Sequence, residues 1–264
     1  MAIALLVAPS FDRFPSRLRN STTVRSLRYL YPVFLLGPFY RWTYHISGLY
    51  FSAPFDGYLL AVDRYLFGFD ISRDLVHILG DRWWLTEWMN FSYLSYYCVT
   101  LYLPIYLYAT GRMNVFFETS FIAGIVIFAC FAIQSVLPAQ GPIHYDPTIG
   151  GYLKAGPISA IAACFLSRAD IPGGAMPSGH IAGTVAVLLL ARRYARKAFW
   201  LTLPIALSLC VSTVYCRYHY AVDGIAGIAI AVVGVYWIGP RLYALLCPFL
   251  SPSQVAYRDI EEAT

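Results

Sequence analysis

The tetrapeptide that ends at His180 has the residue types of a phosphate-binding helix start. It reads Pro177-Ser178-Gly179-His180. Ser178 can cap the helix that follows, and Gly179 allows a ligand to approach the backbone closely. The free N–H groups of the first helical turn would then point at an arriving anion. The tetrapeptide therefore predicts a cradle for a phosphate group, although Pro-Ser-Gly is also a common way to begin a helix.

A second histidine, His219, is followed four residues later by Asp223. In a helical segment this spacing puts the carboxylate on the same face as the imidazole. The carboxylate can accept the proton of one ring nitrogen and leave the other nitrogen free as a nucleophile. Such a pair can also be a hydrogen bond at the membrane interface. We favour catalysis because both histidines stand at the edges of predicted spans, where ionisable groups are costly and tend to be functional.

The composition indicates a membrane environment around these residues. Of the 264 residues, 59% are hydrophobic and 12% are charged, and that charged share is about half the ~25% of an ordinary soluble domain. The formal charge of +5 comes from 19 basic residues scattered among 22 tyrosines and 17 phenylalanines. That pattern excludes a disordered chain and a nucleic-acid-binding protein. We expect one domain embedded in a lipid bilayer.

Apolar stretches of spanning length predict an all-α, polytopic fold with six transmembrane helices. A span needs roughly 20 apolar residues at about 1.5 Å rise each. Six stretches meet this length requirement: residues 29–50, 84–110, 115–137, 179–195, 198–216 and 222–247. Residues 56–82 mix charged and apolar residues at helical spacing, as an interfacial helix does. The connection 138–177 is rich in Gly and Pro and holds a short apolar piece, and a loop of this length is usually functional or disordered.

Twelve basic residues lie at one set of predicted helix ends, and this asymmetry sets the expected orientation. Since cytoplasmic loops carry the excess of Lys and Arg, both termini should be cytoplasmic, and both histidines should lie on the extracytoplasmic side. The expected organisation is a basic N-tail (1–28), a catalytic membrane domain (29–248) and a polar C-tail (249–264). The Arg- and Ser-rich start also suits an organellar transit segment.

The cysteines give no sign of a metal site. All six lie apart from one another, mostly inside apolar stretches, and none forms a CxxC pair. We expect them to be small core residues rather than a disulfide framework or metal ligands.

Taken together, the motifs resemble those of the type 2 phosphatidic acid phosphatase superfamily. The similar stretches are Pro177-Ser178-Gly179-His180, Ser212, His219-Tyr220-Ala221-Val222-Asp223-Gly224 and the turn Pro138-Ala139-Gln140-Gly141-Pro142. The resemblance implies six helices, an extracytoplasmic active site, and phosphoryl transfer in two steps with no metal or other cofactor. It also implies that His219 is the nucleophile that forms a phosphohistidine, that Asp223 orients it, and that His180 is the general acid.

The chain departs from the common phosphatase pattern at two places, and both remove positive charge. Ser212-Thr213 stands where those phosphatases have a Ser-Arg pair, and their Lys and Arg-Pro motif is replaced by residues 140–144, Gln-Gly-Pro-Ile-His. The Ser-Thr-Val-Tyr run before His219 instead resembles the branch of the inositol phosphorylceramide synthases, which transfer a phosphorylated headgroup between lipids.

A phosphoryl group still needs compensating donors and cations. The expected phosphate-binding residues are Ser178, Gly179, Pro177, Gly141, His144 and Arg217. Arg217 lies about 200° round an ideal helix from His219, so it can serve only if the chain turns between them. Lys154 and Arg168 of the long connection are further candidates, and the helix that starts at Gly179 contributes part of the charge itself.

The leading interpretation is a membrane enzyme that cleaves a phosphoester lipid through a phosphohistidine and passes the phosphoryl group to water. The nearest alternative is a lipid phosphotransferase that moves a phosphorylated headgroup, such as phosphoinositol, onto a lipid hydroxyl. An intramembrane serine protease would pair Ser178 with His219. A non-enzymatic transporter or haem-binding protein would use His180 and His219 as ligands.

Overall fold

The computed structural model describes residues 35–43, 45–46, 54–149, 151–169 and 173–246. Within these ranges the regular elements are helices, and the β-type pairing consists of isolated bridges from Ala139 to Gly173 and Gly174. The all-α prediction is therefore confirmed. The expected tails, 1–28 and 249–264, lie outside the described residues, as does half of the predicted first span, 29–50.

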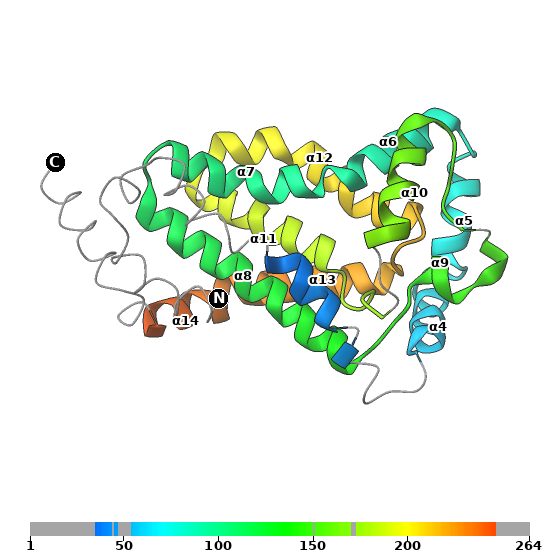
Figure 1. Ribbon diagram of the computed structural model, residues 1–264, viewed down its shortest axis with the longest axis horizontal. Coiled ribbons are helices and arrows are strands. Elements are labelled where there is room, and N and C mark those ends of the chain that lie inside the picture. Colours follow the sequence, from blue (N-terminus) through cyan, green and yellow to red (C-terminus); the bar gives the residue numbers. More distant parts are fainter. Residues whose placement is uncertain (1–34, 44, 47–53, 150, 170–172, 247–264) are drawn as a thin grey trace, which may run out of the picture.

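A bundle of long helices runs along the longest axis of the molecule (Figure 1). It consists of α6 (Trp83–Leu94), α7 (Tyr96–Ala109), α8 (Met113–Val136), α11 (Gly179–Tyr194), α12 (Arg196–Tyr215) and α13 (Ala221–Val233), which continues through the π-helical η2 (Gly234–Ile238) into α14 (Gly239–Leu246). Helix α11 packs against α12, α13 and α8, so it is the central element. Its first turn contains His180.

Among the described residues, three helices are long and apolar enough to cross a membrane by themselves: Met113–Val136, Arg196–Tyr215 and Ala221–Leu246. Their bounds agree with the predicted third, fifth and sixth spans to within two residues. The predicted second span is divided at Ser95 into α6 and α7. Helix α11 has 16 residues, which corresponds to about 24 Å at the usual rise.

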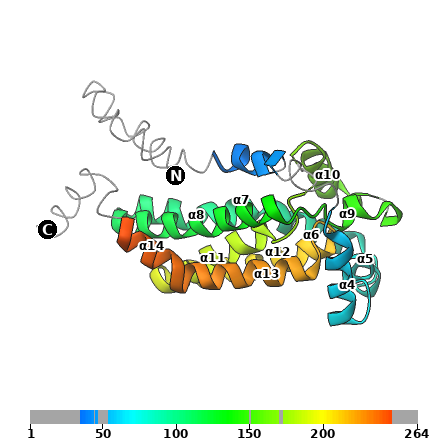
Figure 2. The same cartoon turned by 90° about the horizontal axis from the view of Figure 1, so that it is seen from below.

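Short helices gather at the end of the bundle where the two histidines lie. They are α4 (Asp56–Phe67), α5 (Ile71–Ile78), α9 (Pro142–Tyr145), the 3-10 turn η1 (Pro147–Ile149) and α10 (Pro157–Ala169). In Figure 2, α4 and α5 lie across the bundle axis. The segment expected to be one interfacial helix is therefore two helices, and the short apolar piece of the long connection is α10.

Glu87 of α6 anchors α10 to the bundle. Its Oε2 accepts a hydrogen bond from the N–H of Ile158 (2.8 Å), and its Oε1 accepts one from the N–H of Ser159 (2.9 Å). These N–H groups belong to the first turn of α10, where a helix has no partners of its own for them. A carboxylate on a neighbouring helix thus caps α10 and fixes its position over the site end of the bundle.

Candidate active site

The chain reverses direction between α12 and α13, and His219 lies in that turn. The N–H groups of Tyr218 and His219 both donate to the carbonyl oxygen of Thr213, at 3.0 and 3.1 Å. Arg217 has a φ of +68°, in the left-handed region, which ends α12 and starts the reversal. His219 therefore precedes α13, whereas Asp223 lies in the first turn of that helix.

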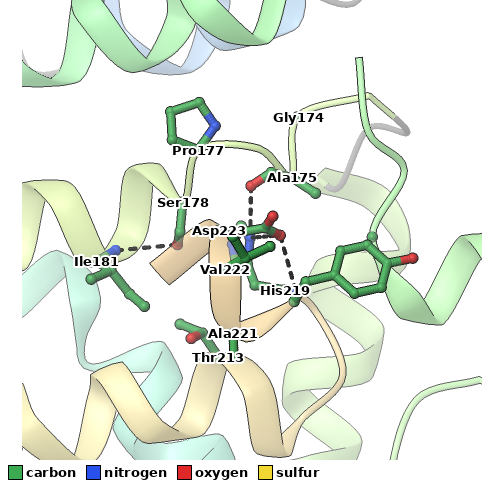
Figure 3. A network of polar contacts seen from close by, with 12 residues as sticks. Gly174, Ala175, Pro177, Ser178, Ile181, Thr213, His219, Ala221, Val222 and Asp223 are labelled. Carbon is green, nitrogen blue, oxygen red and sulfur yellow. Dashed lines mark hydrogen bonds and ion pairs between the residues drawn. The ribbon is translucent and has the colours of Figure 1, made fainter. Parts of the chain in front are cut away.

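The orientation of the His219 ring is set by the loop before α11 (Figure 3). Nδ1 donates to the carbonyl oxygen of Ala175 at 2.9 Å, and Oδ2 of Asp223 lies 3.5 Å from the same nitrogen. Because a carbonyl oxygen can only accept, Nδ1 must bear the proton. Nε2 then has a free lone pair. The side chain is 5% exposed, so this tautomer is held in a site almost closed to solvent.

Asp223 is fully buried and links the starts of two helices. Its Oδ2 accepts the N–H of Tyr220 at 2.9 Å, and its backbone oxygen accepts the N–H of Ser178 at 3.0 Å. Gly227, one turn later, allows the contact: a Cβ there would lie 2.7 Å from the backbone oxygen of Ser178. The His–Asp pair and the Pro-Ser-Gly-His tetrapeptide are thus parts of one packed unit.

His180 lies beside His219 and between aromatic rings. The two imidazole centroids are 5.9 Å apart, and the His180 ring is 4.7 Å from that of Tyr93 and 4.5 Å from that of Tyr96. Ser178 caps α11, because its Oγ accepts the N–H of Ile181 at 3.3 Å. The predicted cap is therefore present, and it places His180 in the first turn with its ring toward His219.

Both histidines line a cavity of about 830 Å³. Gly179 and Gln134 lie on its wall near them, and the Gln134 Nε2 donates to the carbonyl oxygens of Gly174 (3.0 Å) and Pro177 (2.9 Å). Farther along, the described lining is mostly apolar and comes from α7, α8 and α10: Leu101, Pro104, Phe116, Ala123, Ile127, Phe128 and Phe165. A polar pair of histidines therefore stands at one end of a long apolar space.

The expected phosphate-binding residues separate into two groups. Gly179 lines the cavity, and Pro177 and Ser178 precede it in the chain without lining the cavity themselves. Gly141, His144 and Arg217 do not line it. The ring of His144 packs on Tyr152, with centroids 6.4 Å apart.

The chain does turn between Arg217 and His219, but the guanidinium of Arg217 points away from the cavity. Its Nη1 donates to the carbonyl oxygen of Ile149 at 2.8 Å, and burial lowers the pKa of its guanidinium. Among the described residues that line the cavity, the one Lys or Arg is Arg41, which belongs to the helical residues 35–43. Its Nη2 donates to the backbone oxygen of Arg168 on α10 at 3.2 Å.

Two acidic residues of α4 are part of the site although sequence reasoning placed them in an interfacial helix. Asp56 and Asp63 are fully buried, and both bind backbone N–H groups of the site loops. Burial raises the pKa of the Asp63 carboxyl, and the N–H groups of Ala221 and Val222 act in the opposite direction. Their spacing of seven residues in an otherwise apolar stretch is the signal that could have revealed them.

In the part of the chain that the structure describes, no group of three or more His, Cys, Asp or Glu side chains is placed to hold a metal ion. The described cysteines are free thiols, and Cys130 and Cys216 are buried. The prediction that the cysteines are core residues holds for these two, whereas Cys98 and Cys164 are exposed because they lie on outer faces of α7 and α10, and for them the prediction is wrong.

The fold and the site together define a helical membrane protein with a buried histidine–aspartate pair at the end of an apolar cavity. Residues 57–237 match the family model described as PAP2 superfamily, and the chain belongs to that superfamily. A PA-phosphatase related-family protein of Dictyostelium discoideum is 27% identical over 171 residues, which cover 56% of this chain and 31% of the relative. The chain thus spans about a third of that relative's length. No solved structure matches significantly.

Proposed function

We propose that the protein is an integral-membrane lipid phosphate phosphatase that works through a phosphohistidine on His219. The observation that carries the proposal is the hydrogen bond from His219 Nδ1 to Ala175, which leaves the lone pair of Nε2 for attack beside a second histidine. Membership of the PAP2 superfamily supports phosphatase-type lipid chemistry. We further propose six spans, cytoplasmic termini, and a site that opens on the extracytoplasmic side.

In the first step, His219 Nε2 attacks phosphorus, a P–N bond forms, and the P–O bond to the lipid breaks. The lipid alkoxide takes a proton from His180, which acts as general acid. The surroundings of His180 between Tyr93 and Tyr96 favour its neutral form, so the negative charge of the bound phosphate has to stabilise the protonated ring. Asp223, 3.5 Å from Nδ1 of His219, stabilises the positive charge that develops on the nucleophilic imidazole.

In the second step, water attacks the phosphohistidine. Neutral His180 takes a proton from the water, the P–N bond breaks, and inorganic phosphate leaves with His219 back in its starting tautomer. The N–H groups at the start of α11 and the Arg41 guanidinium supply positive charge for the phosphate oxygens. Gly179 keeps that helix start open, because its nearest side-chain neighbour, Gln134 Nε2, would lie 3.9 Å from a Cβ.

The shape of the cavity supports a lipid as substrate. The histidines and Gln134 lie at one end of α8, and Phe116 lines the cavity 18 residues earlier on the same helix, about 27 Å away at the usual rise. The walls between are apolar and aromatic. A substrate that places its phosphate at the histidines can therefore lay a hydrocarbon chain along α7 and α8.

A lipid phosphotransferase is the second candidate. It is favoured by the largely apolar walls beside the histidines, which suit a lipid acceptor as well as a lipid donor, and by Ser212-Thr213 in place of a Ser-Arg pair. The donor would be a phospholipid headgroup such as phosphoinositol, and the acceptor a ceramide or diacylglycerol hydroxyl.

The test uses purified protein in detergent. A lipid phosphate should release inorganic phosphate, and rapid acid-free quenching should trap an acid-labile phosphoenzyme that is absent in His219→Ala. Phosphatidylinositol with ceramide or diacylglycerol should yield no new phospholipid; formation of one would favour the transferase. Retention of more than about a tenth of the activity in His219→Ala would overturn both, because another group would then be the nucleophile.

A further inference from the structure

Helix α13 begins at Ala221, two residues after His219, and carboxylates accept the N–H groups of its N-cap residue and of its first two residues. The N–H of Tyr220 donates to Asp223 Oδ2 at 2.9 Å. The next two N–H groups, of Ala221 and Val222, donate to Oδ2 and Oδ1 of Asp63, each at 2.8 Å. A single fully buried carboxylate of α4 thus binds the two peptide units that follow Tyr220 with both of its oxygens.

Asp56, seven residues earlier on α4, binds the other loop of the site in the same way. Its Oδ2 accepts the N–H of Gln140, and its Oδ1 accepts the N–H of Gly141, both at 2.8 Å. The Tyr220 hydroxyl also donates to Oδ1, at 3.0 Å. Residues seven apart lie on one face of a helix. One face of α4 therefore holds both the turn after α8 and the turn that contains His219.

The opposite face of α4 is exposed, which indicates that the helix is attached to the bundle through the face with the two carboxylates. Tyr58 is 75% exposed and Tyr65 is 88% exposed, so much of the helix makes no contact with the bundle. Contact with α13 comes from the face that includes Asp56, Leu59 and Asp63. Burial of a carboxylate is costly unless strong donors compensate it. The two acidic residues are the polar connection between α4 and the site.

We propose that Asp63 is a positioning residue of the reaction, which fixes His219 in reach of Ala175 by holding the start of α13. Asp56 does the same for the Gly141 turn, which packs against the backbone oxygen of Tyr218. The inference rests on the proposed nucleophilic role of His219. Asp63 itself stays behind the site, where it touches no substrate.

The first experiment compares Asp63→Ala with Asp74→Ala, a matched loss of a carboxylate from the first turn of the neighbouring helix α5. Purified proteins are assayed for kcat, KM and the rate of phosphoenzyme formation. Asp63→Ala should lower kcat and phosphoenzyme formation at least about tenfold, because small displacements of a reacting group are costly. KM should stay within about threefold, since binding groups are unchanged. Asp74→Ala should match the wild type.

A second variant separates positioning from folding. Asp63→Ala leaves the N–H groups of Ala221 and Val222 buried without a partner, which destabilises the fold. Adding Ala221→Pro removes one of them at the first position of α13, where proline is favoured. The preceding residue, Tyr220, has a ψ of 156°, which suits the position before a proline. The double variant should melt at a higher temperature than Asp63→Ala and keep its low kcat.

Three outcomes would contradict the positioning role of Asp63 or the proposed function on which it rests. Recovery of kcat together with the melting temperature would overturn the proposal, because Asp63 would then only stabilise the fold. A normal kcat in Asp63→Ala would overturn it as well. Activity in His219→Ala would instead overturn the proposed function, and with it the reason to look for a positioning residue.

Discussion

Gly141 occupies a backbone conformation that only glycine adopts readily, and its replacement by alanine should disturb His219 from a distance. Its φ is +83° and its ψ is 157°, a combination that costs other residues about 1–3 kcal/mol. A Cβ at this position would lie 2.6 Å from the backbone oxygen of Tyr218 and 3.4 Å from the Cβ of Ala175. Neither neighbour is the end of a flexible side chain.

The two neighbours are also the two supports of His219, the nucleophile that we propose. Tyr218 precedes His219 in the chain, and the Ala175 carbonyl accepts the hydrogen bond from its Nδ1. Strain and overlap together should lower the free energy of unfolding by about 3 kcal/mol. A misplacement of the imidazole by about 1 Å should lower kcat by roughly 100-fold.

Gly68→Ala is the control for strain alone. Gly68 has a φ of +80°, and a Cβ there would meet nothing within 4 Å. It should lower the melting temperature slightly and leave kcat unchanged. The assay is phosphate release at saturating lipid phosphate, with thermal unfolding measured on the same samples. If Gly141→Ala behaved like Gly68→Ala in both measurements, the claim that this turn supports His219 would be wrong.

Three further predictions concern acid catalysis, the α10 anchor and orientation. His180→Ala should slow phosphoenzyme formation from a lipid phosphate far more than from an activated aryl phosphate, because only the poor leaving group needs a proton; equal losses in a burst assay would make His180 a phosphate-binding residue instead. Glu87→Gln should reduce the melting temperature, since the amide cannot accept from both N–H groups of α10, and a loss of about 1–2 kcal/mol in chemical denaturation would match the value of a helix cap; an unchanged transition would refute it. A cysteine at Lys154 should react with an impermeant maleimide in intact cells and one at Arg196 only after lysis; the reverse pattern would place the site in the cytoplasm.

The long helices were predictable because hydropathy over a span decides them. The bounds of α8, α11 and α12 follow from apolar runs that end at polar or turn-forming residues, and all lie within two residues of the prediction. The break at Ser95 was not predictable, because residues 84–103 contain neither Gly nor Pro to mark a helix end. Its Oγ donates to the carbonyl oxygen of Ser92 at 2.6 Å, and a hydroxyl that bonds back to its own helix commonly bends it.

The site was predictable where it is local. Ser178 caps the helix that it precedes, as predicted, and Asp223 lies 3.5 Å from Nδ1 of His219. Spacing did not predict that His219 lies in a turn before the helix, or that Ala175 accepts its Nδ1 proton. The Ala175 carbonyl is 44 positions from His219, and Asp63 is 158 positions from Ala221. Only the packing of α4 and α11 against α13 brings such groups together.

The positions of Arg217 and Arg41 show that closeness in sequence to His219 does not imply closeness to the cavity. Arg217 is two residues from His219, yet its left-handed backbone conformation turns the guanidinium to Ile149. Arg41 is far away in the chain and lies on the wall of the same cavity as both histidines. A positive φ at a non-glycine residue follows from the tight reversal between two long helices, which hydropathy and spacing do not encode.

The shortness of α11 bears on how deep in the membrane a substrate would have to reach to meet His180. Its 16 residues cover about 24 Å, less than the ~30 Å of a bilayer's hydrocarbon core. In the topology that we propose, Arg192 and Arg193 lie at one polar boundary, and His180 at the other end of the helix lies beneath the opposite one. In this proposed placement, an ester with lipid chains would reach the histidines by sinking slightly, and none of its methylene groups would have to be drawn into water at a cost of about 0.8 kcal/mol each. A water-soluble phosphate would instead have to cross the headgroup layer, so the depth of the site would favour molecules that already reside in the membrane.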